Sequence, residues 1–137
     1  MAVYDSGLTV FKITDTGASL RDVSAFITQL DGLPGPRELN DATGLNKTGR
    51  EFHPTLQNAP FTIEFMWSDD ALVGPDTVFG PLRTHTSPTA FEYYPKGGAS
   101  PKYSGNCWVR NWQITTRVGS LLVGRAECQV NGTVTRA

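Results

Sequence analysis

Two histidines and two cysteines are the side chains of this sequence best suited to metal binding or nucleophilic catalysis. They are His53, His85, Cys107 and Cys128. Their types and number suit zinc, but their wide and irregular separations match no compact zinc signature. We therefore expect the two cysteines to act as small, buried core residues. The sequence predicts no metal site and no cofactor.

The remaining candidates for catalysis are carboxylates and serines. Asp69 and Asp70 follow a predicted strand, and adjacent residues of a turn usually both point into solvent, so we do not expect an acid–base pair. No serine lies in a G-x-S-x-G elbow. Gly97-Gly98 follows Pro95-Lys96 and predicts a hairpin turn, not a phosphate-binding loop. We expect no enzyme. A small hydrolase that uses His53 or His85 in a triad of distant residues remains an alternative.

The length and charge of the chain restrict its function further. Its 137 residues predict one domain, residues 1–137, and the net charge of −1 argues against a dedicated nucleic-acid binder. Residues 1–95 carry 12 acidic and 6 basic side chains, whereas residues 96–137 carry 6 basic and 1 acidic. A chain polarised in this way can dock head to tail on copies of itself, although chance scatter gives the same counts.

The basic C-terminal part also contains aromatic residues, among them Trp108 and Trp112. Aromatic rings between cations can stack nucleic-acid bases. We favour core tryptophans and solvated arginines, because an exposed platform usually accompanies a basic domain. The N-terminus lacks a signal peptide and no apolar stretch could span a bilayer, so we expect synthesis in a cytosol, reduced thiols and no membrane anchor.

Strand patterns dominate the elements that must position these residues. Residues 9–14 and 89–94 are rich in β-branched and aromatic side chains, and residues 61–67 alternate between apolar and polar. Residues 105–118 and 121–130 predict a strand pair with a turn at Gly119-Ser120. Asn131-Gly132 predicts a second, two-residue turn before a short last strand. The predicted fold class is mainly β.

Helix is scarce, and one segment is predicted to be a long loop. Residues 76–85 predict one short helix, with Asp76 as N-cap and Pro81 limiting its length. Residues 19–32 fit a helical face and a strand equally well. Residues 37–43 predict a strand, and residues 44–58 predict a long loop, which in a compact domain is typically functional or disordered.

The order of these elements resembles the tail tube (major tail) proteins of long-tailed bacteriophages. The strand Val10-Phe11-Lys12-Ile13 is followed by Asp15-Thr16-Gly17 and by Leu20-Arg21-Asp22-Val23-Ser24-Ala25-Phe26-Ile27. The order continues with an acidic strand that contains Asp41 and Thr43, a long loop, an alternating strand and a short helix. It ends with the "FEYYPKGG" segment and the closing "LLVGRAECQVNGTVTR". The resemblance covers residues 8–136.

The resemblance implies a β-sandwich or barrel-like domain with one flanking helix and a long loop. It implies a structural virion protein that forms hexameric rings, stacked into a tail tube that conducts DNA. The implied partners are copies of itself and other tail proteins, namely tape measure, terminator and baseplate. DNA is implied only as a transient passenger, and the implied location is the virion tail, assembled in the host bacterial cytoplasm. A capsid decoration or head–tail connector protein is the alternative virion component.

Two expectations about surfaces follow from this resemblance. Loop 44–58 is the candidate for contact with a neighbouring subunit, through Arg50, Glu51, Phe52 and His53, with Phe52 as the anchor. The alternative is that Phe52 packs under its own loop. The lumen is expected to be neutral or acidic, because phosphate contacts from lysine and arginine accumulate affinity. We expect most of four cationic side chains to point elsewhere or to be paired, namely Lys102, Arg110, Arg117 and Arg125.

Overall fold

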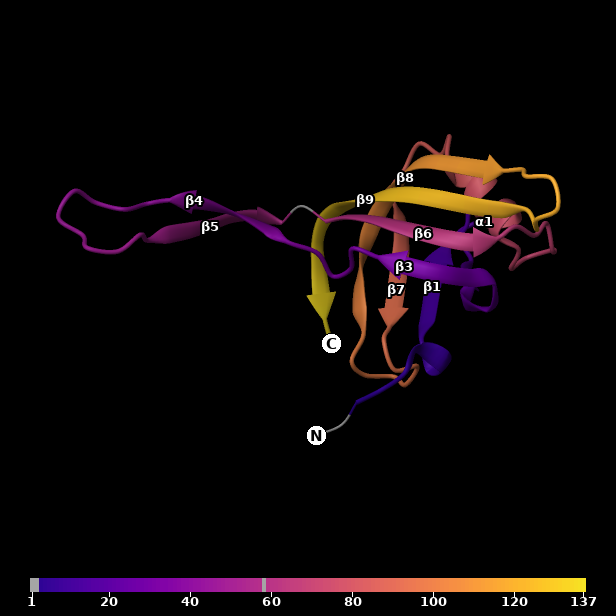
Figure 1. Cartoon of the computed structure of the whole chain (residues 1–137), viewed down its shortest axis with the longest axis horizontal. Helices are drawn as coiled ribbons and strands as arrows, with labels where there is room; N and C mark the ends of the chain where they lie inside the picture. Colours follow the sequence, from indigo (N-terminus) through magenta and orange to yellow (C-terminus); the bar gives the residue numbers. More distant parts are fainter. Residues whose placement is uncertain (1–2, 58) are drawn as a thin grey trace.

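Antiparallel strands make up most of the fold, which confirms the predicted mainly β class. The computed structural model describes residues 3–57 and 59–137. Seven strands form one sheet in the order β2-β1-β7-β8-β9-β6-β3, curled into a half-barrel against which one short helix packs (Figure 1). The bounds of these elements are β1 Val10–Thr14, β2 Leu20–Asp22, β3 Ile27–Asp31, β6 Pro60–Met66, α1 Pro75–Leu82, β7 Thr89–Tyr94, β8 Tyr103–Thr115 and β9 Val123–Arg136.

The curl of the sheet comes from bends in its two longest strands. The first part of β8 runs beside β7, and its later part turns to run across the top of the molecule with β9 (Figure 1). Asn131-Gly132 lies inside β9, where the β8–β9 register shifts between Ser104 and Asn106. The predicted hairpin turn at this dipeptide is therefore wrong. Gly132 has φ +90°, so the dipeptide forms a bulge that bends β9 without reversing it.

Alternation along the central strands creates the core, as the period-two pattern predicted. In β6 the buried residues are Phe61, Ile63 and Phe65, and in β9 the residues Ala126, Cys128 and Val130 are buried in the same way. The intervening residues of both strands lie on the opposite, polar face of the sheet. The alternation therefore assigns one face to the core and leaves the other for contacts outside the domain.

Two aromatic clusters fill the inside of the curl. One joins β1, β6 and β7 and the other joins β6, α1 and β8; they consist of Phe11, Phe61 and Phe91, and of Phe65, Phe79 and Trp112. Ring centroids lie 5.3 to 6.2 Å apart in the first cluster and 5.1 to 6.0 Å apart in the second. These separations are those of favourable tilted and stacked pairs.

The predicted helix exists, but its start differs from the prediction. Gly74 is the N-cap and Pro75 occupies the first helical position, where its missing N–H costs nothing. Asp76 therefore lies inside the first turn and is not the cap. Its Oδ1 accepts a hydrogen bond from Trp112 Nε1 at 3.0 Å, which fixes α1 to β8. The helix ends at Leu82, one residue after Pro81, shorter than the predicted 76–85.

The segment that fitted both helix and strand forms two short strands, β2 and β3, joined by the 3-10 turn Ser24–Phe26. Ser24 explains the break. Its Oγ accepts from the Phe11 amide at 2.8 Å and its hydroxyl donates to the Phe11 carbonyl at 3.3 Å. A side chain thus replaces a strand partner beside β1, and the chain can cross to the other edge of the sheet.

Gly124 offers a test of the second aromatic cluster. A Cβ atom at this position would overlap the six-membered ring of Trp112, which is held by Phe79 and Asp76. We expect Gly124→Ala to lower the free energy of unfolding by about 1–3 kcal/mol, as overpacking does. Urea denaturation measures the change. Gly49→Ala is the control, since nothing lies near that position, and it should stay within about 0.5 kcal/mol of the parent.

Candidate subunit interface

A two-stranded arm projects from the body of the molecule (Figure 1). Its strands are β4 Arg37–Asp41 and β5 Phe52–Gln57, which pair antiparallel and belong to no other sheet. Every residue of both strands is exposed. The predicted strand at 37–43 is confirmed in its larger part. The predicted loop at 44–58 is wrong for β5, and Asn58 lies outside the described residues.

The outer end of the two strands, next to the turn of the arm, is ordered by Asp41 and Thr43, and we call this part the neck. Asp41 Oδ1 accepts from the backbone N–H of Thr43 at 2.9 Å and also from its hydroxyl. The hydroxyl oxygen of Thr43 in turn accepts from the Glu51 amide at 2.8 Å, and the Ala42 amide donates to the Glu51 carbonyl at 2.8 Å. These hydrogen bonds hold the two strands of the hairpin together at the point where they meet the turn.

The predicted contact residues Arg50 and Glu51 are paired within the arm. Arg50 forms an ion pair with Asp41, and Glu51 lies 3.4 Å from Lys47 Nζ. The arm as a whole carries equal numbers of acidic and basic side chains. Its charges therefore compensate one another, and contacts made by the arm are expected to depend on its apolar side chains.

The structure places Phe52 and His53 on opposite sides of the arm. Phe52 lies opposite Asp41, and Pro54 lies opposite Leu39, so these residues share one side. His53 lies opposite Asn40 on the other side. Phe52 is 56% exposed, which rules out the alternative that it packs under its own loop.

Three further apolar side chains of the arm are exposed and were not singled out from the sequence. They are Leu39, Leu45 and Leu56, and Leu45 lies in the turn at the tip. Pattern analysis missed them because a ladder that is solvated on both sides carries no alternation of apolar and polar residues. Leucines isolated among polar residues, on both sides of a turn that contains Gly44 and Gly49, are the signal that could have identified them.

Acid should loosen the neck of the arm. The pKa of Asp41 is lowered by hydrogen bonds from the Thr43 hydroxyl and amide and by Arg50. A carboxyl whose folded pKa is depressed stabilises the fold above its ordinary pKa, and this contribution is lost as pH falls through the folded value. We expect the amide resonance of Thr43 to titrate below the ordinary aspartate range in an NMR titration. Asp41→Asn should abolish that titration.

The polar face of β6, β8 and β9 is a second surface of interest. Glu127 is its central charge: Arg110 Nη2 lies 3.6 Å from Oε2 and Arg125 Nη2 lies 3.5 Å from Oε1. Asn111 Nδ2 also donates to Oε2 at 3.2 Å. With Glu64, this face carries two acidic and two basic side chains, so it is electrically neutral. Sequence analysis did not single out Glu127.

The four cations that we expected to point away from DNA or to be paired are mostly paired. Arg110 and Arg125 share Glu127, and Lys102 Nζ lies 3.2 Å from Glu92 Oε1. Arg117 lies beside the turn between β8 and β9 and has no ion pair within the described part of the chain. The two tryptophans lie on different faces of the sheet, so they form no joint aromatic platform. The expectation of core tryptophans holds for Trp112 but is wrong for Trp108, which lies on the polar face and is 37% exposed.

The residues considered for metal binding or catalysis do not converge. Cys107 and Cys128 are buried neighbours on β8 and β9, as expected, whereas His53 lies on the arm and His85 follows α1. The contact with Cys107 and burial raise the pKa of Cys128, so its thiol stays protonated. Asp69 and Asp70 are exposed. Within residues 3–57 and 59–137 no cluster of histidine, cysteine or carboxylate side chains could hold a metal ion.

The described residues include no helix of the length and apolar character needed to cross a bilayer. No protein-family model matches the sequence, and no curated protein matches it.

Solved structures do match the fold over almost the whole chain. A chain of the virion of a native gene transfer agent particle is 11% identical, has a TM-score of 0.75, and covers 98% of this chain and 99% of its own. A chain of the tail of an empty gene transfer agent particle with C6 symmetry is 12% identical and has a TM-score of 0.78. The match covers 98% of this chain and 99% of that chain.

The structure of the SPP1 tail tube is similar as well, at 11% identity and a TM-score of 0.71, covering 94% of this chain and 77% of that chain. The predicted resemblance is therefore confirmed at the level of fold. The chain shares the fold of the tail and tail tube subunits of phage-like particles.

Proposed function

We propose that the protein is the subunit of a tail tube, a structural virion protein without enzymatic activity that assembles into hexameric rings. The stacked rings would conduct DNA. The observation that carries the proposal is the similarity over 98% of the chain to a subunit of a tail with C6 symmetry. Residues 1–137 are taken as one domain, with the arm as an extension of its body.

The arm supports the proposal independently. An isolated two-stranded hairpin is at best marginally stable in water, and this one buries none of its strand residues on its own body. A neighbouring subunit would bury it. In this role Phe52 is the anchor, Arg50 and Glu51 keep the neck ordered through Asp41 and Lys47, and His53 faces away from Phe52.

The neutral polar face of β6, β8 and β9 is the proposed lumen wall. DNA slides past a surface without sticking only if cations do not accumulate phosphate contacts. On this face Glu127 lies beside both Arg110 and Arg125, and together with Glu64 it balances their charge, so the face offers DNA no net positive charge. The pairing supports the expectation of a neutral or acidic lumen.

The remaining partners are part of the same proposal. A tape measure protein, a terminator and a baseplate component would contact the tube, and assembly would take place in the host bacterial cytoplasm. A chain of the anti-feeding prophage tube-terminating cap has a TM-score of 0.61 at 10% identity over 100% of this chain. That similarity is consistent with a fold used at more than one level of a tail.

Negative-stain electron microscopy over a concentration series, paired with light scattering, tests the proposal. We expect hollow rings or tubes with sixfold end views, formed above a threshold concentration. A discrete trimer, or specific binding to empty capsids without tubes, would contradict the proposal and favour a decoration or connector protein.

A further inference from the structure

Exposed aliphatic side chains gather at the end of the body that is remote from the arm. They lie where β6 and β8 end and β9 begins, and on the turn that joins β8 to β9. We call them the distal patch: Met66, Val118, Leu121, Leu122 and Val123. Their proximity follows from the register, in which Val123 lies opposite both Met66 and Thr115, and from the hydrogen bond of the Trp67 amide to the Leu122 carbonyl.

The distal patch is hollowed on both sides of Val123. A depression of about 260 Å³ is lined by Thr115, Arg117, Ser120, Leu121 and Val123. A second depression, of about 290 Å³, continues across β9 and β6 and shares Thr115 and Val123 with the first. The second depression is lined mainly by polar side chains, among them Glu64 and Arg125, and belongs to the polar face of β6, β8 and β9. The apolar part of the patch is therefore the first hollow, at Leu121 and Val123.

Packing at this end of the core also leaves a polar group unpaired. The indole Nε1 of Trp67 is buried and has no hydrogen-bond partner among the described residues. Leu121, by contrast, is 76% exposed. Exposed apolar side chains that cluster beside an incompletely satisfied core usually mark a protein contact.

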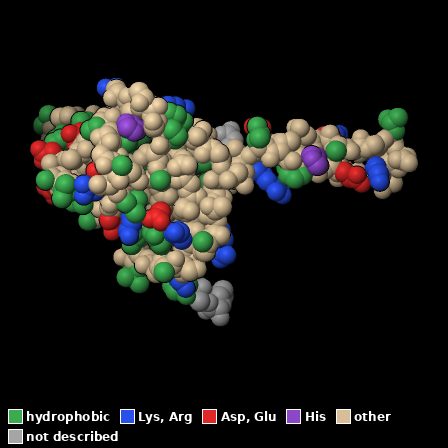
Figure 2. Space-filling model, turned by 180° about the vertical axis from the view of Figure 1, so that it is seen from behind, with side chains coloured by type: hydrophobic (Ala, Val, Ile, Leu, Met, Phe, Trp, Pro, Cys, Tyr) green, Lys and Arg blue, Asp and Glu red, His purple; other side chains and the backbone are tan. Residues whose placement is uncertain are grey.

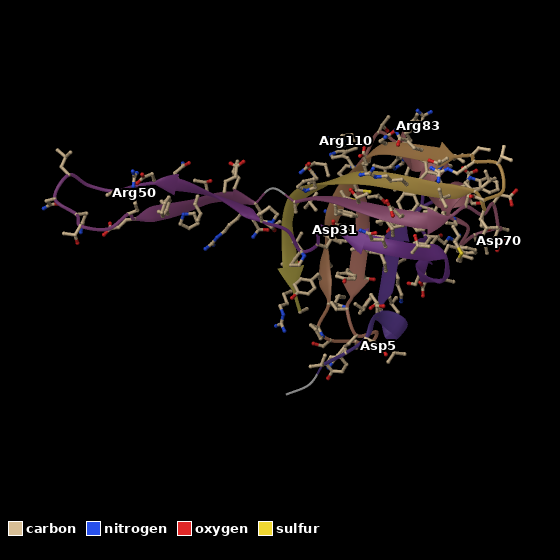
Figure 3. All side chains as sticks on the ribbon, viewed as in Figure 1. Asp5, Asp31, Arg50, Asp70, Arg83 and Arg110 are labelled. Atoms are coloured by element: carbon tan, nitrogen blue, oxygen red, sulfur yellow. The ribbon has the colours of Figure 1, made fainter. Side chains whose placement is uncertain are left out.

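The arm has the properties that an apolar hollow of this kind requires. Its charges compensate one another, and it presents Leu39, Leu45, Phe52 and Leu56 to solvent. The arm and the distal patch lie at opposite ends of the long axis, and Figure 2 shows hydrophobic side chains at both ends. In Figure 3 the labelled Asp70 lies at the distal end of the body, and the labelled Arg50 lies on the arm at the opposite end of the molecule.

We propose that the distal patch is the docking site for the arm of a second copy of this chain. The contact joins two different surfaces, because each subunit offers one arm and one patch. Two subunits joined in this way still have one free arm and one free patch, so further subunits can be added. The arm, at about 3.3 Å per residue, extends about 30 Å from the body and can reach a subunit of an adjacent ring. The inference rests on the proposed tail tube function and names the acceptor surface for the arm.

Cysteine cross-linking tests this contact directly. The native thiols are buried, and the raised pKa keeps Cys128 protonated, so a maleimide reagent should ignore both. Leu45→Cys labels the tip of the arm and Leu121→Cys labels the patch, and both positions are exposed in the single subunit. In tubes of the double variant, a short bismaleimide should produce a ladder of covalent oligomers. A mixture of the two single variants should give dimers only.

Three outcomes would overturn the inference. One is tubes of the double variant, seen in the microscope, that give no ladder. Another is a ladder of the same yield from Leu45→Cys combined with Leu20→Cys, an exposed position on β2 that serves as the matched control. The last is a covalent dimer from Leu45→Cys alone, which would show arm-to-arm contact. Failure of the parent protein to form rings or tubes contradicts the proposed function itself, so the two failures are distinguishable.

Discussion

Replacement of residues 38–56 by an Asn-Gly dipeptide is expected to abolish tube formation while the seven-stranded body stays folded. The change keeps Arg37 and Gln57, which face each other at the base of the arm, and Asn-Gly closes such a pair with a two-residue turn. Gln57 Oε1 still accepts from the Val134 amide at 3.1 Å. The removed strands bury nothing on the body, so no core contact is lost.

The shorter connection should leave the melting temperature of the monomer unchanged or slightly higher, because a shorter loop costs less closure entropy. Circular dichroism follows the fold and electron microscopy follows assembly. Tubes formed by the armless variant would exclude the arm as the stacking element. Loss of the monomer fold would contradict the independence of the body.

A single substitution should reproduce part of this loss. Phe52→Ser removes the largest exposed apolar ring of the arm, and truncation of an interface anchor costs about 2 kcal/mol or more. That cost corresponds to a rise of about 30-fold in the concentration at which tubes form. His53→Ser is the matched control on the opposite side of the ladder and should change this concentration little.

Glu127→Gln is expected to make the tube retain DNA. Glutamine keeps the size of the side chain but removes the charge that holds Arg110 and Arg125. A freed arginine that contacts one phosphate raises DNA affinity about tenfold at about 0.1 M salt, because each contact adds about 0.9 to the slope of log affinity against log salt. The change repeats in every subunit of a ring.

Binding of a short fluorescent duplex to assembled tubes, measured over a salt series, tests this expectation. Glu38→Gln on the arm is the control, since it makes the same change in net charge away from the proposed lumen. Equal binding by the two variants would mean that the polar face of β6, β8 and β9 does not line the lumen. If Glu127→Gln tubes bind the duplex as weakly as parent tubes do, then Glu127 does not prevent the two arginines from binding DNA.

Local patterns were sufficient to predict the core strands. Residues 61–67 alternate, and the structure buries Phe61, Ile63 and Phe65 as that alternation requires. Pro75 and the apolar residues of α1 likewise mark the helix by themselves. A strand or helix with one buried and one solvated face has a periodic pattern of apolar and polar residues. This pattern lies within the segment itself, so it can be recognised without knowing what the segment packs against.

Other features depend on residues far apart in the chain. The strand β5 was missed because both of its faces are solvated and Pro54 counts against a strand, yet a hairpin with two free edges tolerates proline. Asn131-Gly132 has the composition of a turn, but continued pairing with β8 makes it a bulge.

The distal patch and the Glu127 cluster are of the same kind. Val123 lies beside Met66 only through the pairing of β9 with β6, and Glu127 meets Arg110 only across the sheet. Neighbouring residues along a strand point to opposite faces, whereas partners across a sheet share a face, so such surfaces arise from register and from no single stretch of sequence.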